Sequence, residues 1–263
     1  MNKLVEELEN KGIKLDASKD QHFMVDEGIL QTIVEEAGIQ GDEIVLEIGA
    51  GSGNLTKLIS SKAKQVFAIE KDLAMKDVLN ETFPPGSNVY VIYADALKTD
   101  FPFFDKVVSN LPYSICEAFM NRLFRYFFKK AVLTVPKSFA RTLTSKQGDE
   151  EYSKLSLLAQ SFFDVKIVAE IPRTAFHPEP KVDSVVILIE SKKDNLFLKD
   201  FFIQDDKRVK NALRQALFNA KSVDKSDVSG MISKAGLSQT LLEKKVSNLS
   251  LQEIQEILSK FKA

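Results

Sequence analysis

One four-residue motif, Asn110-Leu111-Pro112-Tyr113, holds residue types suited to chemistry on an aromatic amino group. The Asn110 side-chain oxygen and the Leu111 carbonyl can accept the two N–H bonds of such a group, Pro112 fixes the backbone, and Tyr113 can stack on a base. An amino nitrogen whose lone pair is delocalised into a ring needs hydrogen-bond acceptors rather than a strong base. The alternative is a plain loop in which Asn caps and Pro turns the chain.

A glycine-rich loop comes earlier, in Glu47-Ile-Gly49-Ala-Gly51-Ser-Gly53. It follows an apolar strand-like run and opens a helix, which is where the carboxyl end of a parallel sheet meets a nucleotide. Glycines allow close approach of the backbone. The spacing differs from the dinucleotide fingerprint, and no Gly-Lys-Ser/Thr follows, so NAD and a phosphate-binding loop are disfavoured. A tight strand-to-helix connection is the alternative for the loop alone.

Two carboxylates at successive strand ends strengthen the nucleoside interpretation. Glu70 ends the second expected strand, where it can accept both hydroxyls of a ribose. Asp95 ends the third, where it can receive the amino group of an adenine, with Ala96 and Lys71 beside the ring. The set favours S-adenosylmethionine over any phosphorylated cofactor and, with the motif at Asn110, predicts methyl transfer to an amino nitrogen.

Alternating strand and helix signals predict the elements that position these residues. Apolar β-branched runs separated by segments of helical periodicity are typical of βαβ units. We therefore expect an α/β fold, a Rossmann-like, seven-stranded methyltransferase sheet whose last two strands form a β-hairpin. Strands are expected at 44–48, 65–70, 88–93, 106–109, 131–135, 165–171 and 184–190, and helices at 28–37, from 54, and at 73–82, 117–128, 137–145 and 152–162.

The connection of the expected hairpin, residues 172–180, is a candidate for function. It is too long for a tight turn, and its prolines hold it extended. Phe176 within it can close the second side of a bound base. The alternative is a hydrophobic plug in the loop.

Strand signals end near residue 192, and the remainder predicts a small, all-helical domain. We place a methyltransferase domain at 1–191 and a helical docking domain at 192–263, with helices at 205–220, 226–235, 239–246 and 251–261. Lys207, Lys210 and Arg214 recur at helical spacing on one face of the first of these helices. They are candidate RNA contacts, and a solvated face is the alternative.

Composition limits the other classes of protein. The 263 residues are 44% hydrophobic and 28% charged with a net charge of −1, as in a folded domain. A single cysteine, Cys116, and two histidines leave no internal disulfide and no ordinary tetrahedral zinc site, so no metal is expected. No apolar run approaches the length of a membrane span, and the acidic start is unlike a signal peptide. We expect a cytoplasmic monomer.

At these positions the sequence resembles the rRNA adenine N6,N6-dimethyltransferases, the small-subunit dimethyladenosine transferases of ribosome biogenesis. The resemblance covers nearly the whole chain. It rests on residues 20–26, 46–53, 69–70, 94–97, 110–115 and 176–184, and the last two segments together are highly specific.

The resemblance implies a role for each motif. The segment Gln21-His22-Phe23 would line the cofactor pocket, the glycine loop would hold the methionine portion, Glu70 would bind the ribose and Asp95 the adenine amino group. Residues Asn110, Leu111 and Tyr113 would hold the target adenine, and Phe176 would stack on it. The implied reaction transfers two methyl groups to each of two adjacent adenosines near the 3′ end of small-subunit rRNA, in a pre-ribosomal particle.

The chain departs from the family pattern in two places. Asp20 occupies a position where the family usually has glycine, and the family's Ile-Ser-x-Pro is Ile115-Cys-Glu-Ala118 here. Three other readings stay open: a large-subunit rRNA adenine methyltransferase of the macrolide-resistance type, a non-catalytic RNA-binding assembly factor, and a protein-glutamine or DNA-amino methyltransferase.

Overall fold

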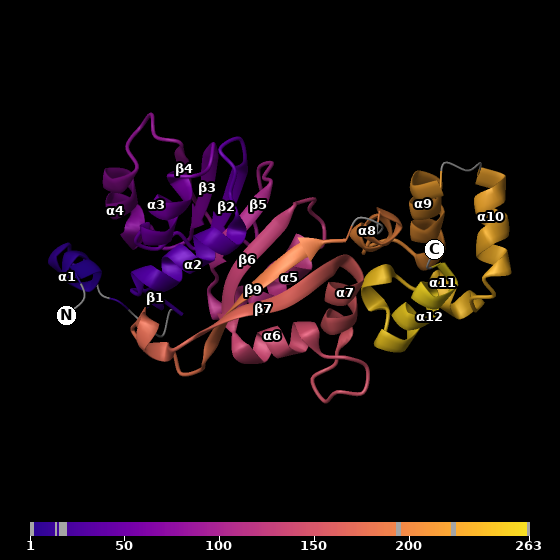
Figure 1. Ribbon diagram of the computed structural model, residues 1–263. Coiled ribbons are helices and arrows are strands. Elements are labelled where there is room, and N and C mark those ends of the chain that lie inside the picture. The colour runs from indigo at the N-terminus through magenta and orange to yellow at the C-terminus, as the bar shows by residue number, and fades with distance from the viewer. Residues whose placement is uncertain (1–2, 14, 16–19, 193–195, 222–224, 262–263) are drawn as a thin grey trace.

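The protein is built on a seven-stranded sheet in the order β4-β3-β2-β5-β6-β9-β7 (Figure 1). The computed structural model describes residues 3–13, 15, 20–192, 196–221 and 225–261. The first five strands in this order, β4, β3, β2, β5 and β6, run parallel to one another. Strand β9 lies between β6 and β7 and is antiparallel to both. The strands are β2 (Ile44–Ile48), β3 (Gln65–Glu70), β4 (Val89–Tyr93), β5 (Lys106–Asn110), β6 (Lys130–Pro136), β7 (Phe163–Ile171) and β9 (Ser184–Ser191). The predicted Rossmann-like sheet with its terminal hairpin is confirmed.

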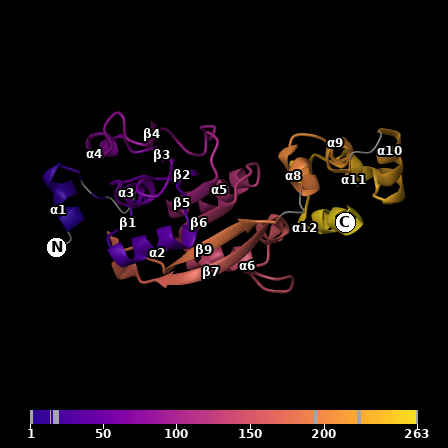
Figure 2. The same ribbon diagram turned by 45° about the horizontal axis from the view of Figure 1, so that its top comes forward.

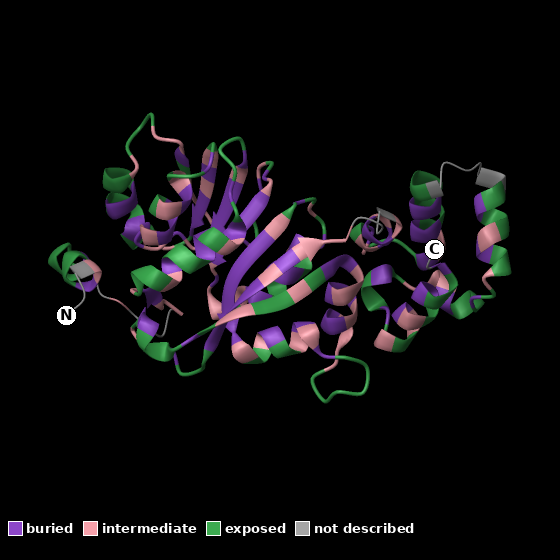
Figure 3. Cartoon of the chain, in the orientation of Figure 1, coloured by how far each residue is buried: buried purple, intermediate pink, exposed green. Residues whose placement is uncertain are grey.

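The central strands β2, β5, β6 and β9 are largely buried on both faces, which is why they read as apolar runs, whereas the edge strand β7 is partly exposed (Figure 3). Alternate side chains of β2 enter different clusters, Val45 on one face and Leu46 and Ile48 on the other. The helices divide in the same way. The first face packs on α2 (Glu27–Ala37), α3 (Asn54–Ser60) and α4 (Lys76–Thr82), and the second on α5 (Cys116–Leu123), α6 (Lys137–Thr144) and α7 (Lys154–Phe162).

A two-stranded sheet of β1 (Phe23–Met24) and β8 (Phe176–His177) joins the start of the chain to the long hairpin connection. Met24 pairs with Phe176, and Phe23 with His177. The connection also contains the short 3-10 helix η4 (Arg173–Ala175). Strands β1 and β8 were not predicted, because two-residue strands carry no periodic pattern. Helix α1 (Lys3–Asn10) was not predicted either.

The C-terminal part is helical, as predicted, and extends away from the sheet (Figures 1 and 2). Its core is continuous with that of the sheet, since Phe162 of α7 packs edge-on against Phe202 with 5.8 Å between ring centroids. The domain boundary at residue 192 therefore stays a prediction. The helices are α8 (Leu196–Ile203), α9 (Val209–Lys221), α10 (Lys225–Lys234), α11 (Gln239–Glu243) and α12 (Leu251–Phe261), with the 3-10 helix η5 (Val246–Asn248) before α12.

Three predicted helix limits were wrong. Helix α5 ends at Leu123 and not at residue 128, because Phe124 and Phe128 leave the helix and pack against Phe163 at centroid distances of 5.7 and 5.3 Å. Helix α9 begins at Val209 and not at residue 205, and α11 ends at Glu243 and not at 246. None of the described helices is long and apolar enough to span a bilayer.

Candidate active site

A cavity of about 510 Å³ opens at the carboxyl ends of β2 to β5. Strand β2 has β3 on one side and β5 on the other, so the cavity lies where the order of parallel strands reverses, the usual ligand position in such sheets. Most of the predicted site residues line it. They are Gln21, His22, Phe23, Gly49, Gly51, Glu70, Lys71, Asp95, Ala96, Asn110, Leu111, Pro112 and Tyr113.

The glycine loop is shaped by close contacts that side chains would obstruct. Gly49 and Gly51 both have positive φ, and a Cβ would lie 3.3 Å from the Pro112 ring at Gly49 and 3.1 Å from Phe23 at Gly51. Gly53 lies apart from these two glycines, and its predicted contact with the cofactor stays a prediction. It does not line the cavity, and a Cβ there would lie 2.9 Å from Phe83, so this glycine allows α3 to pack.

Glu70 braces the glycine loop and faces the cavity. One carboxylate oxygen accepts from the Gly51 N–H at 2.8 Å and the other from the Asp72 N–H at 2.6 Å. Burial raises the pKa of the carboxyl, and these backbone hydrogen bonds offset the rise only in part. Each oxygen keeps a second lone pair, so the group can still accept ribose hydroxyls.

Asp95 lines the same part of the cavity, together with Lys71. Its carboxylate accepts from the Leu97 N–H at 2.9 Å and from the Lys71 ammonium at 3.1 Å, and these partners lower its pKa. The carboxylate is therefore ionised and fixed in orientation at neutral pH. Such a group is suited to accept an exocyclic amino group of a nucleoside.

Glu47 lies beneath the cavity and not on its surface, contrary to the prediction of direct cofactor contact. Its side chain is 1% exposed, and its Oε2 has no hydrogen-bond partner in the part of the chain that the structure describes. Burial raises its pKa to about 8, with the Thr56 hydroxyl lowering it in part and the charge of Glu70 raising it further. Glu47 is thus mainly protonated at neutral pH.

Asn110 ends β5 with its amide fixed and one acceptor atom left over. The Nδ2 donates to the His22 carbonyl at 2.9 Å, which orients the amide. Within the described residues, the buried Oδ1 has no hydrogen-bond partner. A buried acceptor without a partner is destabilising, and because Asn110 lines the cavity, a bound ligand could supply the missing donor.

Tyr113 follows in the 3-10 helix η3 (Tyr113–Ile115) and lines the same cavity. Its ring stacks on His22 with 5.7 Å between centroids, and its hydroxyl shares a hydrogen bond with Ser184. Burial raises the pKa of the phenol to about 12, so the group is neutral. Phe176, in contrast, does not reach the cavity. Its ring is 2% exposed and packs in the core beside Met24, which matches the hydrophobic plug and not the base-stacking role.

Two acidic residues of the cavity lining, Asp20 and Asp72, were not predicted as site residues. Asp72 accepts a 2.6 Å hydrogen bond from the Gln21 side chain, and Asp20 accepts one of 2.6 Å from the Ser114 N–H. The unusual acid at position 20 was a visible signal in the sequence, whereas Asp72 gave none. The lining therefore carries four carboxylates, Asp20, Glu70, Asp72 and Asp95, and one ammonium, Lys71.

The three candidate RNA contacts lie far from this cavity in sequence, at the start of the helical part. Lys210 is paired with Glu243, and Lys207 donates to Gln204 at 3.1 Å. Arg214 is exposed on α9. Lys210 and Arg214 lie on α9, whereas Lys207 precedes this helix, and the contact of all three with RNA stays a prediction.

An acid-rich nucleoside cavity fits S-adenosylmethionine, which carries a cationic sulfonium and no phosphate. In the described ranges, no group of three or more His, Cys, Asp or Glu side chains is placed to hold a metal ion. With the reversal of strand order above, the fold and the site are those of a Rossmann-like methyltransferase.

Comparison with known proteins identifies the family. The model of the family described as ribosomal RNA adenine dimethylase matches residues 13–258. The "Probable ribosomal RNA small subunit methyltransferase A" of Methanosphaera stadtmanae is 40% identical over 98% of this chain and 97% of its own, and that of Pyrococcus abyssi is 37% identical over 95% and 93%. The chain belongs to the ribosomal RNA adenine dimethylase family and is an rRNA adenine dimethyltransferase.

Solved structures agree with this assignment. A dimethyladenosine transferase from Plasmodium falciparum is 29% identical, covers 92% of this chain and 98% of its own, and superposes with a TM-score of 0.64. The 23S rRNA methyltransferase ErmE, 22% identical over 92% of this chain and all of its own, has a TM-score of 0.60 and shows that the fold is shared.

Proposed function

We propose that this enzyme uses S-adenosylmethionine to dimethylate the N6-amino groups of two adjacent adenosines near the 3′ end of small-subunit rRNA, in a pre-ribosomal particle. The observation that carries the chemistry is the fixed, unpartnered Asn110 Oδ1 at the cavity. The choice of subunit is supported by the relatives from Methanosphaera and Pyrococcus, which are named for the small subunit. A cytoplasmic location and a monomeric state stay predictions.

The cofactor would be held by the wall that Glu70 and Asp95 form. Glu70 would accept the ribose hydroxyls and Asp95 the adenine amino group, with Ala96 beside the ring. Gly49 and Gly51 leave the backbone open to the methionine portion, and Gln21 and Phe23 close the pocket from the N-terminal side. When bound, S-adenosylmethionine supplies an electrophilic methyl group on a sulfonium.

The target adenine would be held by the motif at the end of β5. Asn110 Oδ1 and the Leu111 carbonyl would accept the two N–H bonds of the amino group, which favours the pyramidal nitrogen that forms as the methyl arrives. Tyr113, neutral and fixed by Ser184, would stack on the base. Alignment of the nitrogen toward the methyl group supplies the remaining rate enhancement.

The same acceptors give a reason for two transfers. Each transfer forms an N–CH3 bond and releases one N–H proton to water, so after the first transfer one N–H remains on the nitrogen and can still be accepted. After the second transfer none remains, so the product loses both hydrogen bonds to the site and is released. The site therefore favours its substrate and its intermediate over its product.

The substrate test is direct. The protein is incubated with labelled S-adenosylmethionine and unmethylated small subunits, large subunits or naked rRNA, and modified nucleosides are identified by mass spectrometry. We expect dimethyladenosine from small subunits alone. Label in large subunits would reassign the target to that subunit, and cofactor binding without any transfer would favour an assembly role.

A further inference from the structure

Residues 20–23, here called the N-terminal strap, line the cavity and contact two separate parts of its lining. On the cofactor side, Gln21 donates to Asp72 at 2.6 Å, next to the Glu70 carboxylate. On the opposite side, the strap contacts the loop that carries Asn110 and Tyr113. The strap therefore links the cofactor wall to the target loop.

The strap holds the target loop at three points. The His22 carbonyl accepts from Asn110 Nδ2 at 2.9 Å, and the His22 ring stacks on Tyr113 at 5.7 Å. Beyond these, the Asp20 carboxylate accepts from the Ser114 N–H at 2.6 Å. The contacts at Asn110 and Ser114 lie at the first and last residues of the segment 110–114, so they fix both ends of the loop.

Asp20 has a backbone conformation that is unfavourable for most side chains. Among the described residues it is the only non-glycine with positive φ, at 59°. A left-handed conformation is unfavourable for most residues, and Asp and Asn tolerate it best. Its side chain is 21% exposed, and its second oxygen lies 4.0 Å from His22 Nε2. Since His22 Nδ1 faces the Pro178 carbonyl at 2.8 Å, that nitrogen donates and fixes the ring.

We propose that Asp20 is a positioning residue for methyl transfer, which anchors the outer end of the target loop so that Tyr113 and Asn110 keep their orientation toward the acceptor base. This inference rests on the proposed function for the identity of the acceptor. Nothing in it requires Asp20 to touch the reacting atoms. Its carboxylate acts through the Ser114 N–H.

Two substitutions separate the carboxylate from the backbone. Asp20→Gly keeps the left-handed conformation accessible and removes the acceptor, whereas Asp20→Asn keeps both an acceptor oxygen and tolerance of that conformation. Gln21→Ala serves as the matched variant on the cofactor side. Protein melting curves confirm that each variant is folded.

The first readout is independent of activity. Amide hydrogen exchange at Ser114 in the free protein should be about tenfold faster in Asp20→Gly and unchanged in Asp20→Asn, because loss of a hydrogen bond to a charged acceptor allows local opening. Equal exchange in wild type and Asp20→Gly would overturn the proposal. This measurement is unaffected if the enzyme acts on another RNA.

The second readout compares the effect of each substitution on cofactor affinity with its effect on the rate of methyl transfer. Asp20→Gly should lower the single-turnover rate about fivefold to tenfold with an unchanged dissociation constant for S-adenosylmethionine, and Asp20→Asn should restore the rate. Gln21→Ala should weaken cofactor binding instead. A rate in Asp20→Gly equal to wild type, or a loss of cofactor affinity equal to the loss of rate, would contradict the assignment.

Discussion

Each end of strand β2 has a buried acid, and the two acids are held in opposite protonation states. Glu43, just before the strand, is 4% exposed, and Glu47, near its carboxyl end, is 1% exposed. The pKa of Glu43 is lowered to about 2, whereas that of Glu47 is raised to about 8. Both acids are shielded from solvent, but Glu47 lies deeper in the protein and only Glu43 has ammonium partners, so depth and partners together give opposite protonation states.

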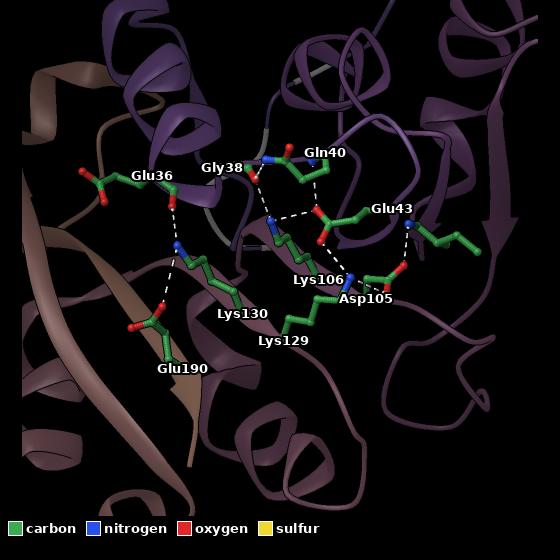
Figure 4. A network of polar contacts seen from close by, with 10 residues as sticks. Glu36, Gly38, Gln40, Glu43, Asp105, Lys106, Lys129, Lys130 and Glu190 are labelled. Atoms are coloured by element: carbon green, nitrogen blue, oxygen red, sulfur yellow. Dashed lines mark hydrogen bonds and ion pairs between the residues drawn. The ribbon is translucent and has the colours of Figure 1, made fainter. Parts of the chain in front are cut away.

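At the amino end, a network of ion pairs and hydrogen bonds satisfies Glu43 (Figure 4). Burial raises the pKa of its carboxyl, but hydrogen bonds from Lys106, the Gln40 N–H and Lys129 outweigh that effect. Lys106 lies 2.8 Å from Glu43 and also donates to the Gly38 carbonyl at 2.7 Å. This end joins α2 to β5 and leaves no role for a ligand.

At the carboxyl end, polar groups remain incompletely satisfied around the cavity. Glu47 Oε2 and Asn110 Oδ1 have no hydrogen-bond partners among the described residues. Only the second of these residues lines the cavity. The comparison indicates that the sheet is stabilised at one end, while the other end keeps acceptors for its ligands.

The largest expected effect comes from breaking the network. Glu43→Gln should lower the free energy of unfolding by about 3–5 kcal/mol, because it leaves the buried Lys106 without a countercharge. Urea denaturation measures this, and cofactor affinity should not change. Glu190→Gln is the matched control, since that exposed acid lies 3.8 Å from Lys130 and should change stability by less than about 1 kcal/mol. Equal effects of the two variants would remove the distinction between the ends.

The pH dependence of stability should differ in sign for the two acids. The folded pKa of Glu43 is below the ordinary value of 4.5, so its contribution is present above pH 4.5 and is lost as pH falls toward 2. The folded pKa of Glu47 is above that value, so its contribution is present below pH 4.5 and is lost as pH rises toward 8. Glu47→Gln should thus stabilise the protein by about 2 kcal/mol at pH 9 and have little effect at pH 4. Unfolding curves at both pH values check this, and a stabilisation that does not depend on pH would contradict it.

A third effect tests the cofactor wall. Glu70→Ala should raise the dissociation constant of S-adenosylmethionine about tenfold, because it removes the ribose acceptor and the brace on Gly51. Titration calorimetry measures the constant. Glu43→Gln, at the other end of the sheet, is the control, and a wild-type constant in Glu70→Ala would refute the role of Glu70.

The smallest expected effect lies on the helical part. Arg214→Glu should weaken binding to small subunits about threefold and reduce the salt dependence of binding by about one phosphate contact. Lys234→Glu on α10 gives the same charge change on another exposed helix position. If the two variants weaken binding equally, the effect at Arg214 comes from the general charge of the protein and not from a specific contact with RNA.

The sheet and most of the cavity were predictable from the sequence because their signals are local. Apolar runs mark strands that are buried on both faces, and the residue after each parallel strand reaches the same edge. For this reason the sequence predicts Glu70, Asp95 and Asn110 at one edge of the sheet, and all three line the cavity. The prediction that Gln21, His22 and Phe23 line the cofactor pocket came from the family resemblance and not from a local pattern.

The features that sequence reasoning missed depend on contacts between distant segments. The pairing of Met24 with Phe176 buries the phenylalanine ring that was expected at the cavity. Gly53, predicted from its spacing as a cofactor residue, also packs close to Phe83, a contact that no local pattern indicates. The partner of Asp20 is Ser114, far along the chain, and no local pattern predicts that hydrogen bond.

The measurement that tests the account most directly is Asn110→Ala, with cofactor affinity and single-turnover transfer to unmethylated small subunits measured on the same protein. Since we propose Asn110 Oδ1, which has no partner among the described residues, as an acceptor for the target amino group, we predict a rate at least about 100-fold lower and a cofactor dissociation constant within about threefold of wild type. An unchanged rate would contradict the central claim. An equal loss of rate and of cofactor affinity would place Asn110 in the cofactor site instead.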